Sequence, residues 1–382
     1  MDRSVELSLI DELLALKASN TPFLDDAVAT SPVSRYLSED RFSAEQRKIF
    51  RRLPNAAAHV SELPENGSFL RREVGGAPVL ITRDKEGAAH AFLNVCRHRG
   101  TRLVDEPSGC KHRFSCPYHA WTYSSAGDLI GAPHFDVGFP GRDKADLGLT
   151  RLACVEKHGF IWVHPSVGER LELEAWLDGL SADLDALGMA AMRIAAEDDV
   201  VREANWKILV EGGIEAYHFR VAHRSTIGPH FEDNLSSYQS FGPHMRAALP
   251  RTSMASLTEE ARDRWRLRDH ANVLYTLFPS SQLLVMQDHI VWIRQEPLAP
   301  GRTALRLATL APPPAEGEQG GDDAHWKRNH QITMTTLDED FLIGESIQAS
   351  ASSGANDVML FGRFEGALAA FNNTVSAMLE CE

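Results

Sequence analysis

The strongest constraint on this chain comes from two short segments, each of which carries one cysteine and one histidine. They read CRHRG from Cys96 and CPYHAW from Cys116, so the spacing is C-x-H, seventeen intervening residues, then C-x-x-H. Each pair is short enough to be presented by one tight loop. Two thiolates and two imidazoles on two such loops predict a metal centre, and the surrounding chain has to hold the loops face to face.

The mixed pairs distinguish between two kinds of metal centre. A structural zinc site usually takes paired cysteines as C-x(2–4)-C and paired histidines as H-x(3–5)-H. In a Rieske [2Fe–2S] cluster two Cys bind one iron and two His bind the other, which raises the reduction potential. The spacing therefore favours a Rieske cluster held by Cys96, His98, Cys116 and His119. We also expect Tyr118 to donate a hydrogen bond toward a cluster sulfur.

Length and charge narrow the class of protein. A chain of 382 residues suits two domains, and a net charge of −14 argues against nucleic-acid or anionic-membrane partners. No apolar run approaches the roughly 20 residues of a membrane span, and the N-terminus has the pattern of an amphipathic helix and not of a signal peptide. Cys110, Cys154 and Cys381 remain outside the cluster, and this odd number favours reduced thiols in the cytoplasm.

Changes in the helix and strand patterns along the sequence divide the chain into three parts. We expect helices over residues 1–50 that pack on the catalytic domain, an all-β Rieske domain over 51–165, and a catalytic domain over 166–382. Within the last part, helices are predicted near 172–187, 206–222, 327–351 and 362–380, and strands near 199–203, 274–278, 282–287, 289–297 and 303–311. Residues 312–323, rich in Pro, Gly and acids, are predicted to form a surface loop.

A second metal site is predicted in the catalytic domain. The segment from Glu215 to His223 has the spacing E-x-x-H-x4-H. One helical turn would place Glu215 and His218 on one face, with His223 closing in from the helix end. A non-haem Fe(II) oxygenase needs two His and one carboxylate on one side of the metal. Among sixteen histidines the pattern alone is weak, but it gains force after a Rieske domain.

The third ligand is expected from an acidic run distant in sequence. Asp338, Glu339 and Asp340 are predicted to start a helix, and acids in that position usually offset the positive end of the helix dipole. Asp340 is favoured as the ligand because it directly precedes the apolar stretch Phe341–Ile343, with Asp338 as the alternative.

Together these segments resemble the α subunits of Rieske non-haem iron oxygenases over nearly the whole chain. The resemblance rests on NVCRHRG, CPYHAW, GFIWV, NWK, E-x-Y-H-x4-H and a Glu-Asp pair in a C-terminal helix. It implies an α+β fold, with an all-β Rieske domain and a helix-grip (START-like) catalytic domain whose antiparallel sheet wraps a long helix. It implies a [2Fe–2S] cluster on Cys96, His98, Cys116 and His119, and a mononuclear Fe(II) on His218, His223 and Asp340.

The resemblance also implies a function. The chain would be the oxygenase component of a multicomponent system, a mono- or dioxygenase that uses O₂ to hydroxylate or O- or N-demethylate a small organic substrate. Electrons from NAD(P)H would arrive through a separate flavin/iron–sulfur reductase or ferredoxin, since the chain has no GxGxxG motif. A head-to-tail homotrimer is expected, in which the carboxylate of Glu215 links a cluster His of one subunit to an iron His of its neighbour.

The substrate is open at this stage. An aromatic substrate is expected, and a quaternary amine such as carnitine or betaine is the alternative, because Glu215 stands where most relatives have Asp, as in the carnitine oxygenases. Four aromatic residues could form a cage for such a cation: Phe231, Tyr275, Phe278 and Trp292. A redox-coupled ligand-binding protein without oxygen chemistry is an alternative of another class, and it would not need a second metal site.

Overall fold

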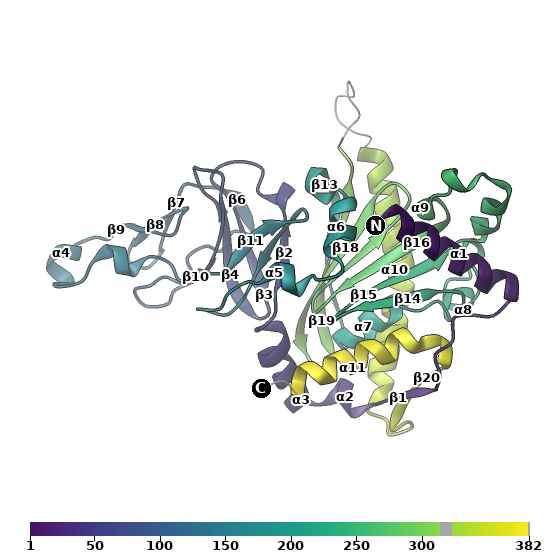
Figure 1. Cartoon of the computed structure of the whole chain (residues 1–382). Helices are drawn as coiled ribbons and strands as arrows, with labels where there is room; N and C mark the ends of the chain where they lie inside the picture. The colour runs from purple at the N-terminus through teal and green to yellow at the C-terminus, as the bar shows by residue number, and fades with distance from the viewer. Residues whose placement is uncertain (314–322, 381–382) are drawn as a thin grey trace. The chain divides into compact units, whose positions relative to one another are not determined.

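The computed structural model describes residues 1–313 and 323–380, so part of the predicted loop at 312–323 and Cys381 lie outside the described residues. The chain divides into two compact units (Figure 1). One is Gln46–Trp176, and the other combines Met1–Glu45 with Leu177–Glu382. Within the described part of the chain, no helix has the length and apolarity needed to span a membrane.

The unit Gln46–Trp176 is built from three antiparallel sheets, with strand orders β10-β5-β4-β3-β6, β11-β12-β2 and β7-β8-β9. Its strands are β2 (Asn55–His59), β3 (Ser68–Val74), β4 (Ala77–Arg83), β5 (Ala89–Leu93), β6 (Ser108–Cys110), β7 (Arg113–Ser115), β8 (Thr122–Ser124), β9 (Leu129–Gly131), β10 (Arg151–Leu152), β11 (Cys154–Lys157) and β12 (Phe160–Val163). Its helical segments are short, among them α4 (Phe135–Gly138) and α5 (Leu173–Trp176).

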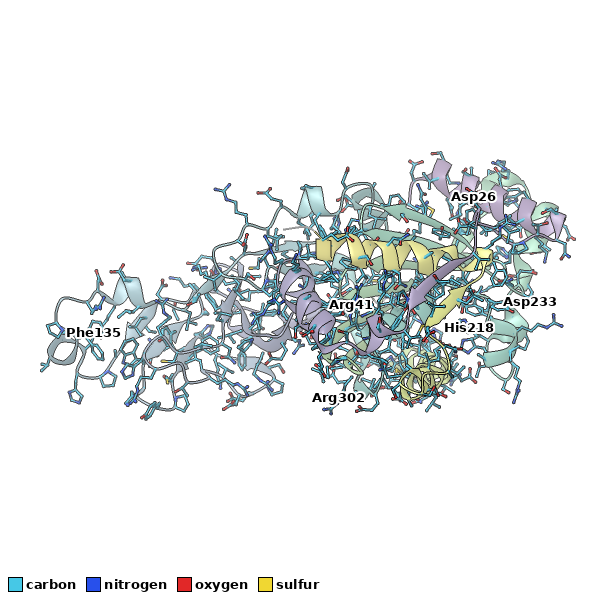
Figure 2. All side chains as sticks on the ribbon, turned by 90° about the horizontal axis from the view of Figure 1, so that it is seen from below. Asp26, Arg41, Phe135, His218, Asp233 and Arg302 are labelled. Atoms are coloured by element: carbon cyan, nitrogen blue, oxygen red, sulfur yellow. The ribbon has the colours of Figure 1, made fainter. Side chains whose placement is uncertain are left out.

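Strand β4 explains how this unit is packed. Its run of apolar residues is buried on both faces, because Leu80 belongs to one core while Val79 and Ile81 belong to another. The core that contains Leu80 extends to Trp121, next to the second ligand loop. Phe135, labelled in Figure 2, packs edge-on against Trp121 with ring centroids 5.9 Å apart. The ligand loops are therefore attached to a well-packed β core.

The other unit contains a seven-stranded antiparallel sheet of order β13-β19-β18-β17-β16-β15-β14. Its strands are β13 (Arg193–Arg202), β14 (Ser237–Phe241), β15 (His244–Pro250), β16 (Ala271–Leu277), β17 (Ser281–Val285), β18 (Ile290–Ala299) and β19 (Arg302–Ala311). From β14 to β19 each strand pairs with the next along the chain, and β13 completes the edge beside β19. The strands predicted between 274 and 311 are present, whereas β14 and β15 were not predicted. The apolar pattern of β15 is interrupted by His244 and Arg246, which are buried with polar partners.

Two helices cover one face of this sheet: α7 (Trp206–Gly213) and the long α10 (Asp323–Ala351), which Figure 1 shows running across it. Leu209 of α7 and Phe341 of α10 share a core with Ile293 and Leu305 of the sheet. The remaining helices are α1 (Arg3–Ser19), α2 (Ser34–Leu37), α3 (Glu39–Glu45), α6 (Ser181–Ala186), α8 (Phe219–Ala222), α9 (Leu267–His270) and α11 (Gly366–Glu380).

Some predicted elements differ in extent. The helix expected over 172–187 is two short ones, α5 and α6, because Gly179 between them has a left-handed φ of 79°. A strand that was not expected, β1 (Ala29–Pro32), pairs with β20 (Val358–Phe361), and this pairing joins segments far apart in sequence. The two C-terminal helices lie close to their predicted ranges.

A buried ion pair anchors the start of α7. Asn205 caps the helix by accepting the Lys207 N–H at 3.0 Å. The Lys207 side chain is fully buried, and its Nζ lies 2.7 and 3.0 Å from the two carboxylate oxygens of Glu45. Trp206 Nε1 donates to the same carboxylate at 2.9 Å. The helix that leads into the predicted iron ligands is thus fixed to α3.

This pair gives a stability prediction. Lys207→Met should lower the free energy of unfolding by about 3 kcal/mol, because it leaves the Glu45 carboxylate buried without its main counter-charge. The measurement is a urea titration followed by circular dichroism. As a matched control, Arg262→Ala breaks an exposed pair with Asp11 and should hardly move the midpoint. Equal small shifts for both variants would contradict the role given to Lys207.

Candidate metal centres and substrate cavity

The two predicted cluster loops contain the same kind of backbone turn. Cys96 N–H donates to the Thr101 carbonyl at 2.8 Å, and Gly100 N–H donates back to the Cys96 carbonyl at 3.0 Å. Backbone hydrogen bonds of the same two lengths join the equivalent positions in the loop that starts at Cys116. The fifth residue of each loop, Gly100 or Ala120, has a positive φ of 78° or 55°. Two equivalent turns therefore present one Cys and one His each.

The four predicted cluster residues converge, but not on a single point. Cys96 and Cys116 are buried, while His98 and His119 lie nearer the surface with their Nδ1 atoms 3.1 Å apart. Among the described residues, these four do not form a group whose donor atoms all lie within 4.8 Å of one another; only the site described below does. The set is too wide for one zinc ion and suits a cluster of two irons.

Tyr123, and not Tyr118, approaches a cluster cysteine. The Tyr123 hydroxyl lies 3.4 Å from Cys96 Sγ and accepts the Arg97 N–H at 3.0 Å, so its own proton is free to point at the sulfur. Tyr118 is 55% exposed and accepts a hydrogen bond from Arg99. The structure therefore places Tyr123, and not Tyr118, beside a cysteine of the predicted cluster. Sequence reasoning missed Tyr123, which lies on β8 just after the second loop.

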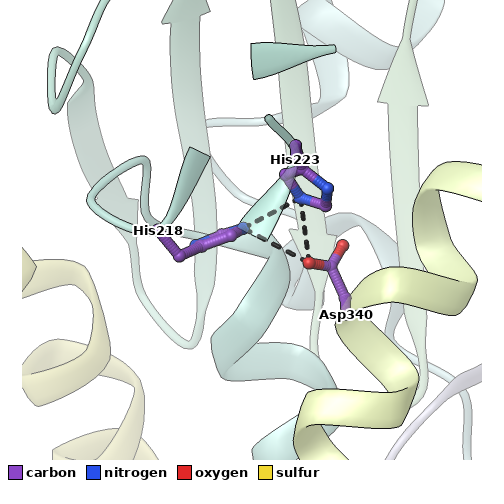
Figure 3. A group of neighbouring side chains, drawn as sticks. All are labelled: His218, His223 and Asp340. Carbon is purple, nitrogen blue, oxygen red and sulfur yellow. Dashed lines mark hydrogen bonds and ion pairs between the residues drawn. The ribbon is translucent and has the colours of Figure 1, made fainter. Parts of the chain in front are cut away.

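In the other unit the predicted iron ligands come together. Asp340 Oδ1 lies 2.9 Å from His223 Nε2 and 3.3 Å from His218 Nε2, and the two Nε2 atoms are 3.1 Å apart (Figure 3). Asp338 pairs instead with Arg202. Of the two acids considered for the third ligand, the structure brings Asp340 to the histidines.

The local structure around these histidines differs from the single helix predicted over 206–222. Helix α7 ends at Gly213 and α8 begins at Phe219, so Glu215 and His218 lie in the turn between them. The carboxylate of Glu215 accepts the backbone N–H groups of Tyr217 and His218. A side chain that binds its own backbone in this way favours a turn over a continuous helix.

Each of the two histidines is hydrogen-bonded to a carboxylate through its Nδ1 atom. Glu215 bonds to His218 Nδ1, and Glu339 bonds to His223 Nδ1 at 2.7 Å while accepting the Thr226 hydroxyl at 2.6 Å. Both rings therefore turn Nε2 toward Asp340. The acids at 338–340 lie in the middle of α10, so the predicted helix start and its dipole role are wrong. Sequence reasoning included Glu339 only among the acids of this run and did not predict its bond to His223.

The electrostatics of this group suit a cation. Burial alone would lower the pKa of His218, but hydrogen bonds to Asp340 and Glu215 outweigh it and raise the pKa to about 10. The same kind of balance holds the pKa of Asp340 below its usual value, because its bonds to the two histidines outweigh its burial. Two imidazoles and one carboxylate on one side are the donor set of non-haem Fe(II) sites. The residues fit that metal.

A narrow cavity of about 80 Å³ adjoins the three residues, and His223 and Asp340 line it. The wall is mostly apolar and comes from α7, α10 and the sheet. Its other polar side chains are all neutral: Asn272, Gln282, Gln295 and Thr336.

The predicted aromatic cage is not formed in this cavity. Of its four members only Phe231 is in the lining. Tyr275 is buried with its hydroxyl on Asp183, and Trp292 is buried with its Nε1 on Ser281. Phe278 packs elsewhere in the core. These aromatic side chains belong to the core of the sheet, and the cage prediction was wrong.

A second hollow meets the same site from another side. Glu215, His218 and Asp340 line it together with apolar residues of α10 and β20. Several of those are unusually exposed for their type, including Ile343 at 45% and Leu360 at 69%. The three metal-binding candidates thus adjoin both the narrow cavity and an apolar groove.

Comparison with known proteins identifies the two parts of the chain. Residues 54–143 match the model of the Rieske [2Fe–2S] domain, and residues 183–381, more than half of the chain, match the ring hydroxylating alpha subunit (catalytic domain). The chain belongs to the ring-hydroxylating α-subunit family. This confirms the predicted family, the α+β class with its Rieske and catalytic domains, and the two cofactors, a [2Fe–2S] cluster and mononuclear iron.

Relatives with named activities are oxygenases. The chain is 29% identical over 400 residues to the glycine betaine monooxygenase oxygenase subunit of Chromohalobacter salexigens, covering 90% of this chain and 87% of that one. It is 37% identical over 210 residues to the N,N-dimethyl phenylurea N-demethylase subunit alpha of Sphingobium sp., covering 53% and 45%. This ring-hydroxylating α subunit is therefore an oxidoreductase of the mono- or dioxygenase type, which disfavours a ligand-binding protein without oxygen chemistry.

Solved structures share the fold. The quaternary ammonium Rieske monooxygenase CntA in complex with L-carnitine superposes with a TM-score of 0.77 at 23% identity, over 92% of this chain and 96% of that one. Naphthalene 1,2-dioxygenase from Rhodococcus sp. superposes with a TM-score of 0.76 at 18% identity, over 98% of each chain.

Glu339 gives the prediction for this site. Glu339→Ala should weaken iron binding at His223 by about 10- to 100-fold, because a ligand imidazole loses the partner that orients it. Glu339→Gln should weaken it less, since an amide oxygen still accepts the Nδ1 proton. The measurement is an anaerobic Fe(II) titration with the visible spectrum of the cluster recorded in parallel.

The matched control is Asp338→Asn, one residue away on α10 and paired with Arg202. It should leave iron affinity unchanged. If Asp338→Asn releases iron and Glu339→Ala does not, the assignment of these acids is wrong.

Proposed function

We propose that this α subunit oxygenates a small, neutral and largely apolar organic molecule, with an aromatic substrate as the leading class. The observation that carries the proposal is the composition of the cavity wall. Among the described residues that line it, the only ionisable side chains are His223 and Asp340, both proposed metal ligands. A charged substrate buried there would lose its hydration shell. No charged side chain of the wall, other than the metal ligands, would compensate for that loss.

The proposed ligands divide the chemistry between the two units. Cys96, His98, Cys116 and His119 hold the cluster, and His218, His223 and Asp340 hold the iron. When bound, the cluster delivers single electrons and the iron activates O₂. The two histidines and Asp340 occupy one side of the metal position, and the apolar wall seats the substrate on the side that opens to the cavity.

A quaternary amine is the second candidate. Similarity to glycine betaine and carnitine monooxygenase subunits supports it. A trimethylammonium group is bound by aromatic faces or carboxylates, and a substrate carboxylate would need a basic partner. The described lining offers no such basic residue, and its aromatic side chains are limited to Phe219, Phe231 and Phe341. The phenylurea demethylase among the relatives supports a neutral substrate.

Electron supply and assembly complete the proposal. A separate reductase or ferredoxin reduces the cluster in the cytoplasm, and three chains form a closed head-to-tail ring. His119 is exposed, and the apolar groove beside Glu215 is a surface on which a neighbouring subunit could place it. Glu215 already bonds to His218, so a second hydrogen bond to the neighbour's His119 would connect the two sites. Inter-subunit electron transfer is described for a quaternary ammonium Rieske monooxygenase of the same fold.

The substrate proposal is tested with a surrogate reductase and a panel of compounds. Neutral aromatic amides, ethers and ureas should give product and consume NADH and O₂ in step with it, whereas carnitine and glycine betaine should not. Product is measured by mass spectrometry, because uncoupled O₂ consumption alone does not identify a substrate. Turnover of the quaternary amines in preference to every neutral compound would overturn the proposal.

Glu215 tests the electron route. Glu215→Gln should keep both metals and the oligomer but lower turnover at least about tenfold, since an amide cannot accept protons from two imidazoles as a carboxylate does. The measurement is the single-turnover rate of cluster oxidation, with sedimentation velocity to check assembly. The control is Glu365→Gln, another acid of the groove, which bonds to the Gly362 N–H and should retain activity. A fully active monomer would rule the route out.

A further inference from the structure

Gln295 has a buried amide oxygen with no partner. The residue is on β18, is 1% exposed and lines the cavity beside the metal ligands. Its Oε1 makes no hydrogen bond to any residue that the structure describes. Buried polar atoms are nearly always hydrogen-bonded, so an exception in a cavity wall marks a place for a ligand or a water molecule.

The backbone holds Gln295 in this position. Its N–H donates to the Ser280 carbonyl at 2.8 Å. Ile293, two residues earlier on the same strand, also lines the cavity, as expected when alternate side chains of a strand face one side. The amide is therefore part of a rigid sheet wall and not of a loop.

The neighbouring strand adds a second amide. Gln282 of β17 is aligned with Ile293 and lines the same wall. Its Nε2 donates to Thr276 Oγ1 at 3.3 Å, so its oxygen is the end left for a ligand. Near Gln295 the wall thus carries two amide side chains, within a surface that is otherwise mostly apolar.

We propose that the substrate carries an N–H donor that bonds to Gln295 Oε1, and that it is a neutral carboxamide or urea with an apolar body. The inference deepens the proposed function, on which its neutral class rests. An amide N–H supplies the missing donor without bringing a charge into the cavity. The bond to Gln295 would fix one end of the substrate, so that the apolar body extends along the wall toward the metal ligands.

Binding is measured on the oxidised holoenzyme by calorimetry with a matched pair of probes, N-methylbenzamide and methyl benzoate. They differ in replacing the amide N–H by an ester oxygen. The amide should bind about 3- to 10-fold more tightly, the worth of one net hydrogen bond. Equal affinities, tighter binding of the ester, or no saturable binding of either probe would overturn the inference.

Variants assign the preference to one residue. Gln295→Met, close in shape but without an amide, should bind both probes equally and keep the wild-type affinity for methyl benzoate, which also shows that the cavity is intact. Thr336→Val is the control within the same wall, because its hydroxyl already donates to the Ile332 carbonyl at 3.1 Å. It should keep the amide preference, and retention of that preference in Gln295→Met would contradict the role of Gln295.

The binding assay is independent of turnover. If the amide is preferred but no neutral compound is oxidised with a surrogate reductase, the role of Gln295 stands and the proposed function fails. If neutral aromatics are oxidised while the two probes bind equally, the proposed function stands and the inference about the N–H donor fails.

Discussion

The hydrogen bonds that Glu215 accepts from His218 Nδ1 and Glu339 accepts from His223 Nδ1 determine how the catalytic site is built. An imidazole has two nitrogens, and a carboxylate on Nδ1 fixes both the ring's rotation and the nitrogen that faces the metal. Both rings consequently turn Nε2 to the same point, where Asp340 arrives from α10. These two carboxylates help to set the orientation of His218, which lies in the turn between α7 and α8, and of His223, which follows α8.

The two supporting acids come from different elements and connect the site to different parts of this unit. Glu339 lies on α10, which packs on the sheet, so the orientation of His223 depends on the core. Glu215 lies beside the apolar groove, so the orientation of His218 depends on whatever covers that groove. In the proposed ring a neighbouring subunit would act on one histidine while the other stays fixed by the core.

The sequence predicted those parts of the site whose geometry is local. Cys96 with His98, Cys116 with His119, and Glu215 with His218 are each within one turn or loop, so spacing alone indicated them. Contacts between distant segments were not predictable in this way. Glu339 is 116 residues from His223, and no spacing rule relates them.

The choice between Asp338 and Asp340 shows the same limit on a smaller scale. Residues two apart on a helix point roughly 200° apart around its axis, so only one of the two acids can face the histidines. The rotation of α10 is set by its packing against the sheet, through residues such as Met334 and Phe341. Asp338 consequently faces Arg202 of β13. The same rotation lets Glu339, roughly 100° from Asp340, reach the back of His223.

Substrate specificity depends on other residues than those that bind the metals. Similarity to a betaine monooxygenase covers 90% of the chain at 29% identity, and the sequence motifs that resemble the family lie mainly at the metal sites. The cavity wall depends on a few positions outside those motifs, among them Gln282 and Gln295. Asp340 is the carboxylate among the described residues of the cavity wall, and it bonds to both imidazoles, so that wall has no other carboxylate to pair with an ammonium group. The substrate class therefore has to be inferred from the neutral amides of the wall, and not from the overall similarity of the chain.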